Sequence, residues 1–454
     1  MSFPQAFLAT PQGTKPMKIG LIGTFDVENF GDCMFPELYQ HLLSQKIPDA
    51  QFHLYSPTDN CALILSFDKV DTLPTHLGET QTFDEDALIL IGGETIGMGH
   101  SAGTFNFPRQ TLSAYMRLWV MPILSFLDTE ARPKFFGAHC VGAIKMRSEV
   151  NEKVAQVLNG ASHCAFRDEF SASWIRSGDI GFSKKVDPMF LIDHLRSKDE
   201  WSQLTKKHLP DVYIKTGYLS VQMTMGYGGD DLDGWCDAVA TISKTVGLPV
   251  ALVPICHFLQ DEAFLDIARV RLEQRGIECT LIRGLINVKD TAALIGGSAG
   301  YIGSSLHGAV TAVAFAKPIA VLGHSMDGKH EGCLKAVGIS GAVTTTPEGL
   351  AKCFETTAAS DLKVTRARAQ DAARKSFDTL LLALVTMREI DPAVAKDAQK
   401  RAAELSASET AAMPVMSKME IKRRLLRGLH RFPALSKRYH ALRIRQKVGR
   451  ATHS

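Results

Sequence analysis

The sequence predicts an α/β protein with two doubly wound domains that face a cleft, followed by a C-terminal helical extension. Short apolar segments typical of strands alternate with helical patterns in the first half of the chain. A second series of such segments begins near residue 211. The length of 454 residues also exceeds the size at which a single hydrophobic core keeps growing, so more than one domain is expected.

The strand-like segments can be placed from their apolar runs. In the first series they cover residues 18–23, 52–55, 62–66, 87–92, 134–138 and 162–166. In the second series they cover residues 211–216, 249–255, 279–282, 301–304 and 319–322. Helical patterns lie between them, for example at 107–126 and 149–159. This alternation predicts mostly parallel sheets with helices on both faces.

The two series and the composition divide the chain into five parts. We expect an N-terminal segment at 1–16, a first domain at 17–200, a second domain at 201–345, a helical extension at 346–413 and a tail at 414–454. The domain boundary falls in the charged stretch 195–210, which lacks a strong apolar run. Apolar residues recur at helical spacing in the extension, which is expected to pack on the second domain.

Composition excludes several classes of protein. With 45% apolar and 22% charged residues, the chain has the composition of an ordinary soluble globular protein. No apolar run reaches the roughly 18 residues that span a bilayer, and the N-terminus lacks a signal-peptide pattern, so we expect a cytoplasmic protein. The nine cysteines form no Cys-x-x-Cys pair and the histidines are loosely spaced, so no disulfide framework or metal site is expected.

The tail carries an unusual excess of positive charge. From Lys418 onward there are twelve Lys and Arg against one acid, which gives +11, so the preceding residues sum to 3 − 11 = −8. Ile421, Leu425, Leu429 and Phe432 follow helical spacing within this basic segment. Such an amphipathic helix is typical of peripheral contact with an anionic membrane, here the inner membrane surface. A solvated end without fixed structure fits the charge equally well, and no recognised nucleic-acid-binding module accompanies it.

The most informative segment joins a short strand to an apolar helix. It reads Gly303-Ser304-Ser305-Leu306-His307-Gly308 and continues to a Lys-Pro pair at 317–318. Ser304, Ser305 and His307 therefore fall beyond the carboxyl end of a strand and at a helix N-terminus, where open α/β sheets bind anionic ligands. The alternative is that Ser305 only caps the helix and His307 is a structural histidine.

Four other segments precede this one in order. They read Asn29-Phe30-Gly31-Asp32, Leu88-Ile89-Leu90-Ile91-Gly92-Gly93-Glu94, Phe166-Arg167-Asp168-Glu169-Phe170-Ser171 and Val186-Asp187-Pro188. Together with the Ser-Ser-Leu-His-Gly segment, they closely resemble the polysaccharide pyruvyl transferase family over about residues 17–325. Each motif is weak alone, but five in the same order are hard to obtain by chance.

The resemblance implies a fold and an activity. The fold is a pair of Rossmann-like domains facing a cleft, similar to the GT-B glycosyltransferases. The implied reaction moves a pyruvyl group from phosphoenolpyruvate to a saccharide as a ketal, in exopolysaccharide or cell-surface glycan biosynthesis. The acceptor would be lipid-linked or nucleotide-linked, and no cofactor is implied besides the donor. Leu306 and His307 match the family's donor-site pair.

Four residues are candidates for the chemistry. His307 is the best acid or base, because an imidazole titrates near working pH. Arg167 offers a bidentate clamp for a carboxylate or phosphate, although it could instead form an internal ion pair with Asp168. His139 is a second acid–base candidate or a core residue, and Glu94 could accept a proton from the acceptor or simply be solvated.

The remaining candidates would bind the donor or the acceptor. Gly31 allows close approach of a ligand, and Asp32 could contact it or cap the next helix. Ser305 stands where the family often has an arginine, and Lys317 could replace that lost cation or only complement a helix end. The full set of expected binding residues is Asn29, Gly31, Asp32, Gly92, Gly93, His257, Ser305, Leu306 and Lys317.

Two alternative functions stay open at this point. The same architecture would suit a glycosyltransferase that uses a nucleotide sugar. A non-catalytic saccharide-binding relative is the other, because Ser305 and Glu94 depart from the family pattern. The glycine run at 92–103 does not spell the dinucleotide fingerprint and no Gly-Lys-Ser/Thr loop is present, so a nicotinamide cofactor is not expected.

Overall fold

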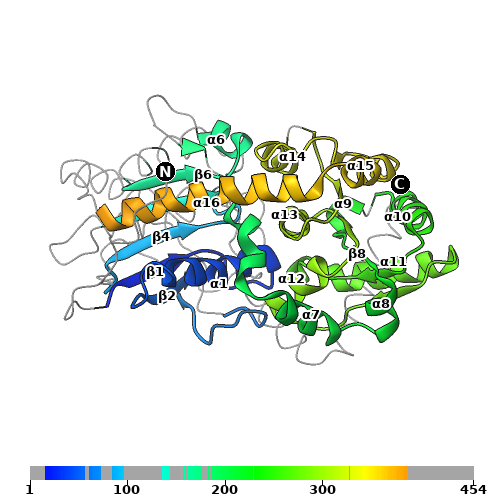
Figure 1. Ribbon diagram of the computed structural model, residues 1–454, viewed down its shortest axis with the longest axis horizontal. Helices are drawn as coiled ribbons and strands as arrows, with labels where there is room; N and C mark the ends of the chain where they lie inside the picture. The colour runs from blue at the N-terminus through cyan, green and yellow to red at the C-terminus, as the bar shows by residue number, and fades with distance from the viewer. Residues whose placement is uncertain are drawn as a thin grey trace, which may run out of the picture.

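The computed structural model describes residues 16–56, 61–72, 84–96, 135–143, 155, 158, 161–175, 183–184, 186–228, 230–326 and 328–386. These residues form two α/β domains side by side, joined along one side by a long helix (Figure 1). This confirms the predicted fold class, a pair of Rossmann-like domains in a GT-B-like arrangement with a helical extension.

The first domain is built on a parallel sheet. Among the described residues this sheet has seven strands in the order β3-β2-β1-β4-β5-β6-β7, and every pair is parallel. The strands are β1 (Lys18–Ile22), β2 (Gln51–Ser56), β3 (Asp71–Thr72), β4 (Ala87–Ile91), β5 (Phe135–Val141), β6 (His163–Phe166) and β7 (Ser183–Lys184). The helices are α1 (Phe30–Ser44), α6 (Glu169–Ile175) and the 3₁₀ helix η3 (Pro188–Leu195). From β1 the strand order runs to β2 and β3 on one side and to β4 and the later strands on the other. The switch point therefore lies between β1 and β4, the position where doubly wound sheets bind ligands.

The second domain repeats this plan. In the part of the chain that the structure describes, its sheet has six parallel strands in the order β10-β9-β8-β11-β12-β13. The strands are β8 (Leu219–Val221), β9 (Val250–Leu252), β10 (Cys279–Leu281), β11 (Gly300–Gly303), β12 (Ile319–Leu322) and β13 (Val343–Thr344). Here the switch point lies between β8 and β11, so the segments after these two strands are placed to bind a ligand.

Helices cover both faces of the second sheet. They are α7 (Lys198–Lys206), α8 (Asp211–Thr216), α9 (Met225–Gly228), α10 (Leu232–Val246), the 3₁₀ turn η4 (His257–Leu259), α11 (Asp261–Gln274), α12 (Val288–Gly296), α13 (Leu306–Ala314), α14 (Lys329–Lys335) and α15 (Gly349–Ala358). Every residue of α13 is buried, because it packs against α12, η3 and the sheet.

Two predicted strands are wrong. Residues 211–216 form α8, because Pro210 precedes its first turn, Gly217 ends it with φ +86°, and Tyr213 buries one side of it. Residues 62–66 form a turn in which Ile64 accepts a hydrogen bond from Val288 of the second domain. The short strands β3, β7, β8 and β13 were not predicted, because two or three residues carry too little pattern.

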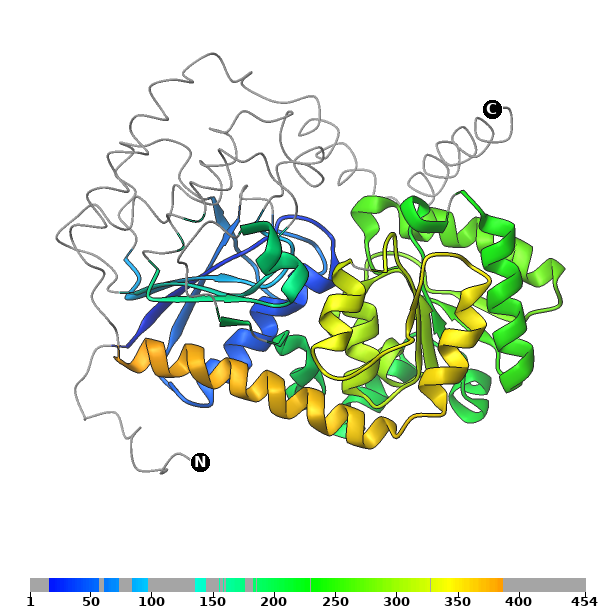
Figure 2. The same cartoon turned by 90° about the horizontal axis from the view of Figure 1, so that it is seen from above.

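The helical extension packs on the second domain, as expected, and also reaches the first. After α15, helix α16 (Leu362–Thr386) runs back along both domains (Figure 2), against η3, α13 and β5. Arg366 Nη2 lies 2.5 Å and Gln370 Nε2 2.7 Å from the Asp193 carboxylate. Near the other end, Ser376 lies against His139 of the first domain. Helix α16 therefore packs across both domains, alongside η3, which ends the first domain.

Some expectations concern residues that lie outside the described ones. These are the helical pattern at 107–126, all but residues 155 and 158 of the pattern at 149–159, the N-terminal segment up to residue 15, and everything after residue 386, including the basic tail. None of the described helices is both long and apolar enough to cross a bilayer.

Leu380 tests whether α16 is part of the folded core. Leu380 is fully buried, whereas Leu382 on the same helix is 50% exposed. Leu380→Ala should lower the free energy of unfolding by about 2–5 kcal/mol because it leaves a cavity. Leu382→Ala should change it by less than about 0.5 kcal/mol. Chemical denaturation of both variants gives the comparison, and equal, small effects would show that α16 does not stabilise the fold.

Candidate active site

The carboxyl ends of the two sheets meet at one cavity of about 220 Å³. The first domain contributes the segments after β1, β4 and β6, and the second contributes those after β8, β9 and β11 and the start of α14. Of the predicted site residues, those that line it are Asn29, Asp32, Glu94, Arg167, Ser305, Leu306 and His307. The folding of two separate domains thus brings together side chains that are nearly 280 residues apart in the sequence.

Backbone hydrogen bonds hold the two domains together at this cavity. Phe30 N donates to Ile255 O at 3.0 Å, and His257 N donates to Glu28 O at 3.0 Å. Asn29 and Cys256 form an antiparallel bridge between these bonds. The loop after β1 and the loop after β9 therefore bond to each other like two short antiparallel strands. This bonding fixes one edge of the cleft.

His307 is held between two carboxyl-bearing segments of the first domain. Its Nε2 lies 3.4 Å from Oδ2 of Asp187, which is fully buried, and neither atom has another partner among the described residues. Asp187 is itself fixed, because its Oδ1 accepts a hydrogen bond from Met189 N at 2.9 Å. This arrangement favours a proton on Nε2, facing the Asp187 carboxylate.

Gly31 lets His307 approach the first domain. A Cβ atom at Gly31 would overlap Nδ1 of the His307 ring, so a larger residue would displace the ring or helix α1. The ring also meets Phe35 edge-to-face, with centroids 5.2 Å apart. Gly31 was predicted to allow approach of a ligand, and the structure shows that it allows approach of a side chain from the other domain.

Arg167 is a buried cation with one unused donor group. Its side chain is 1% exposed, and Nε donates to Asp168 Oδ2 at 2.9 Å, as the alternative prediction proposed. Nη2 has no hydrogen-bond partner among the described residues and lies beside Gly142. Burial acts to lower the pKa of Arg167, but the carboxylates of Asp168 and Glu94 raise it above its usual value. Arg167 therefore stays charged and can hold an anion.

Glu94 forms an ion pair across the cleft. Nζ of Lys329, at the start of α14, donates to Glu94 Oε2 at 2.9 Å. Burial acts to raise the pKa of Glu94, but Lys329 and Arg167 outweigh it and lower the pKa to about 2. A carboxylate with so low a pKa is a poor proton acceptor at neutral pH. The structure therefore does not favour the predicted role of Glu94 as a base.

Asp32 has the opposite environment. It lies in the first turn of α1 and accepts a hydrogen bond from Asn29 Nδ2 at 2.8 Å. Asn29, and not Asp32, is the residue that caps the helix, since its side chain accepts from Gly31 N at 3.2 Å. Burial raises the pKa of Asp32, and the nearby Glu94 charge raises it further, while His307 lowers it. Asp32 is thus better suited than Glu94 to exchange a proton.

Gly92 and Gly93 shape the turn after β4. Both have positive φ, +48° and +67°, which residues with a side chain rarely adopt. A Cβ on Gly92 would overlap the Phe35 ring, and one on Gly93 would lie 2.6 Å from Asp32 Oδ1. Neither is among the residues that line the cavity, so their role is to let the turn pass close to α1.

The N-terminus of α13 is only partly available to a ligand. Gln222 Oε1 accepts hydrogen bonds from Ser304 N at 3.1 Å and Ser305 N at 3.0 Å. Ser305 Oγ in turn caps the helix by accepting from Gly308 N at 3.2 Å. The amides of Leu306 and His307, which have no acceptor within a helix, are left to bind an anion.

Three further predicted site residues, besides the glycines, do not line the cavity. His139 is fully buried in β5, where Nδ1 lies 2.5 Å from the Tyr39 hydroxyl and Nε2 lies 3.2 Å from Ser376 Oγ, so it is a core residue. His257 donates its backbone N–H to the first domain, and its neighbours Cys256, Phe258 and Leu259 line the cavity instead.

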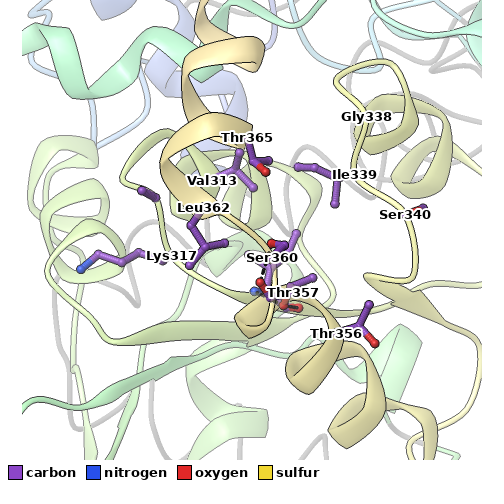
Figure 3. Close-up of a pocket in the computed structure, with 12 residues that line it drawn as sticks. Val313, Lys317, Gly338, Ile339, Ser340, Thr356, Thr357, Ser360, Leu362 and Thr365 are labelled. Carbon is purple, nitrogen blue, oxygen red and sulfur yellow. Dashed lines mark hydrogen bonds between the residues drawn. The ribbon is translucent and has the colours of Figure 1, made fainter.

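Lys317 is the third of these residues. It follows the far end of α13 and lines a separate pocket of about 200 Å³ beside α15 and α16. Figure 3 shows its side chain pointing away from the other labelled residues of that pocket. The expectation that Lys317 supplies a cation to the donor site is therefore wrong, because a whole helix separates it from the cleft.

The structure adds three residues that the sequence did not single out. Lys329 supplies the second cation of the cavity, Asp187 orients His307, and Gln222 binds the amides before α13. Asp187 was part of a recognised motif, but nothing in the motif shows that it faces His307. Gln222 and Lys329 lie outside the motifs, so no local pattern could have identified them. Among the described residues, no cluster of three or more His, Cys, Asp or Glu could hold a metal ion.

Comparison with known proteins shows the family of this chain. The sequence profile for "Polysaccharide pyruvyl transferase" matches residues 29–326, which is more than half of the chain. The chain belongs to the polysaccharide pyruvyl transferase family. It is therefore a transferase that acts on polysaccharide. The match includes Asn29, Arg167 and His307 of the cavity, whereas Lys329 lies just beyond its end. No curated protein matches the chain significantly.

Several solved structures are similar at low identity. Staphylococcus aureus MnaA with UDP is 13% identical with a TM-score of 0.49, covering 82% of this chain and 98% of that one. UDP-GlcNAc 2-epimerase from Neisseria meningitidis is 11% identical with a TM-score of 0.45, covering 80% and 100%. The wall teichoic acid polymerase TagF is 11% identical with a TM-score of 0.41, covering 87% and 89%.

Substitution of Gly31 tests the contact between the domains. Gly31→Ala should destabilise the protein by about 1–3 kcal/mol, because the new methyl group overlaps the His307 ring. Gly226→Ala is the matched control, since a Cβ there has its nearest neighbour at 3.7 Å, and it should change stability by less than about 0.5 kcal/mol. Unfolding in denaturant measures both. Equal stability of the two variants would mean that His307 does not rest against Gly31.

Proposed function

We propose that this transferase moves a pyruvyl group from phosphoenolpyruvate to a pair of saccharide hydroxyls, forming a ketal and releasing phosphate. The observation that supports it is one cavity lined by two cations, the buried Arg167 and the partly exposed Lys329, next to a histidine paired with a carboxylate. A donor with both a carboxylate and a phosphate needs such paired positive charge. The saccharide acceptor would belong to exopolysaccharide or cell-surface glycan biosynthesis.

The donor would be held by charge and by backbone amides. Arg167 lines the cavity, and its Nη2 has no hydrogen-bond partner among the described residues, so we assign one anionic group of the donor to Arg167. Lys329 and the amides of Leu306 and His307 are positioned to hold the other, as helix N-termini do for phosphate groups. Glu94 keeps Lys329 in place and, at a pKa of about 2, stays ionised while doing so.

Protons would move through His307 and Asp32. The reaction adds a proton to the methylene carbon of the donor, which makes C2 electrophilic, and removes one proton from each attacking hydroxyl. One of those protons balances the new methyl group and the other leaves with phosphate. His307, oriented by Asp187, would transfer one proton, and Asp32, with its raised pKa, would transfer the other.

Phosphate release provides the direct test. Purified protein should release inorganic phosphate from phosphoenolpyruvate only when a suitable glycan is supplied. His307→Ala should lower kcat by roughly 10²–10⁴-fold, because it removes a group that moves a proton in the transition state. His41→Ala, near the opposite end of α1 and outside the cavity, is the control and should leave kcat unchanged.

Other outcomes would favour the alternatives. If the protein releases a nucleoside diphosphate from a sugar nucleotide but no phosphate from phosphoenolpyruvate, it is a glycosyltransferase. Binding of saccharide without either reaction would indicate a non-catalytic relative. Full activity of His307→Ala would remove the proposed role of His307 while leaving the reaction itself in place.

We also propose that the tail after Pro414 tethers the enzyme to an anionic membrane surface, where a lipid-linked acceptor would be found. This proposal depends on the sequence, because these residues lie outside the described ones. Each Lys or Arg near an anionic surface contributes about 1 kcal/mol, so the +11 of charge after residue 417 is sufficient for firm binding.

Truncation at residue 413 tests the tether. The shortened protein should keep its activity on soluble acceptors but lose binding to vesicles that contain phosphatidylglycerol. The intact protein should leave those vesicles as salt rises, since ions screen surface charge within about 8 Å at 0.15 M. Sedimentation with the vesicles measures both. If the intact protein ignores anionic vesicles at low salt, the tail has another role.

A further inference from the structure

Gln222 is a fully buried side chain that links several parts of the site. It directly follows β8, and its Oε1 accepts hydrogen bonds from the amides of Ser304 and Ser305. The same oxygen lies 3.1 Å from the Tyr301 hydroxyl, which donates to it. One amide oxygen thus faces three donors that surround the start of α13.

The other end of the Gln222 amide is fixed by a carboxylate. Gln222 Nε2 donates to Asp261 Oδ2 at 2.8 Å, and Asp261 is fully buried. The same Oδ2 accepts from Ile255 N at 3.2 Å and from Cys256 N at 2.9 Å. The amide therefore has only one good orientation, because turning it over would place its NH₂ group against the donor amides and its oxygen against Asp261.

The segment held by Asp261 is the one on which the first domain docks. Ile255 O accepts the hydrogen bond from Phe30 N, and Cys256 pairs with Asn29. Gly31, which follows Phe30, meets His307 at the start of α13. The contacts thus form a closed ring, from the first domain through Cys256, Asp261 and Gln222 to α13 and back to the first domain.

We propose that Gln222 and Asp261 are positioning residues that hold the N-terminus of α13, and with it His307, at a fixed place relative to the first domain. Neither residue needs to touch the reacting atoms. Their effect on turnover follows from geometry, since a displacement of about 1 Å in a reacting group can cost about 10²-fold in rate. This inference rests on the proposed function for its kinetic readout only.

Two nearly isosteric substitutions test the proposal. Gln222→Met removes both the donor and the acceptor, and Asp261→Leu removes the Oδ2 atom that accepts from Gln222, Ile255 and Cys256. Thr357→Val is the matched control, because Thr357 is also buried in the second domain and bonds to the backbone of Ile319, but it lies outside the cavity. All three variants lose buried hydrogen bonds, so all should lose some stability.

The kinetic result separates positioning from stability. Gln222→Met and Asp261→Leu should lower kcat by about 10²-fold, more than they raise the KM for phosphoenolpyruvate, while Thr357→Val keeps the wild-type kcat. A kcat within twofold of wild type in folded Gln222→Met and Asp261→Leu would overturn the proposal. An equal loss in Thr357→Val would also overturn it. If Gln222→Met does not fold, as judged by circular dichroism, Asp261→Leu decides.

A second readout does not depend on the reaction. The imidazole signals of His307 can be assigned in histidine-labelled protein by NMR, from their loss in His307→Asn. They should shift in Gln222→Met and Asp261→Leu and stay unchanged in Thr357→Val. Unchanged signals in the first two variants would overturn the proposal. If wild-type protein releases no phosphate from phosphoenolpyruvate, the proposed function fails, and this spectroscopic comparison still decides the role of Gln222 and Asp261.

Discussion

The site depends on the backbone pairing between the loop after β1 and the loop after β9. Residues 28–30 of the first loop pair with residues 255–258 of the second, and the pairing places Gly31 of the first domain directly against His307 of the second. Because the two sheets carry their ligand-binding ends at β1 and β8, this contact joins their switch points into one cavity. Helix α16 supports the same arrangement from outside by packing on both domains.

The ionisable side chains of the cavity have pKa values that are shifted in different directions. The Lys329–Glu94 pair crosses the cleft, and both groups stay ionised, since each shifts the pKa of the other in the direction that favours charge. Asp32, on α1 beside Gly93, has the opposite shift, because burial raises its pKa. The pKa values of two carboxylates in one cavity are thus moved in opposite directions by their surroundings.

The sequence alone predicted the fold well where patterns were long. The strands β1, β4, β5 and β12 and the helix α13 were found from their apolar runs. Segment 211–216 was misread because its β-branched and aromatic residues suit a strand, whereas Pro210 and Gly217 make it a helix. The path of α16 could not be predicted, because an amphipathic helix does not specify which surface it will cover.

Residues in motifs at strand ends could be placed in the cavity from the sequence, but residues whose position depends on distant contacts could not. Arg167, Asp32 and His307 lie in the cavity because the carboxyl ends of parallel strands converge. His139 also follows a pattern at a strand, but the Tyr39 and Ser376 side chains enclose it. Gln222 and Lys329 act through partners more than twenty residues away, which no local pattern records.

The central claim is that cations from both domains and His307 form one donor site. A crystal structure of the protein with phosphoenolpyruvate, grown without acceptor, tests it most directly. We expect the carboxylate and phosphate of phosphoenolpyruvate to lie against Arg167, Lys329 and the start of α13, with its methylene carbon beside His307 or Asp32. Phosphoenolpyruvate bound away from this cavity, or bound there without contact to Arg167 and Lys329, would contradict it.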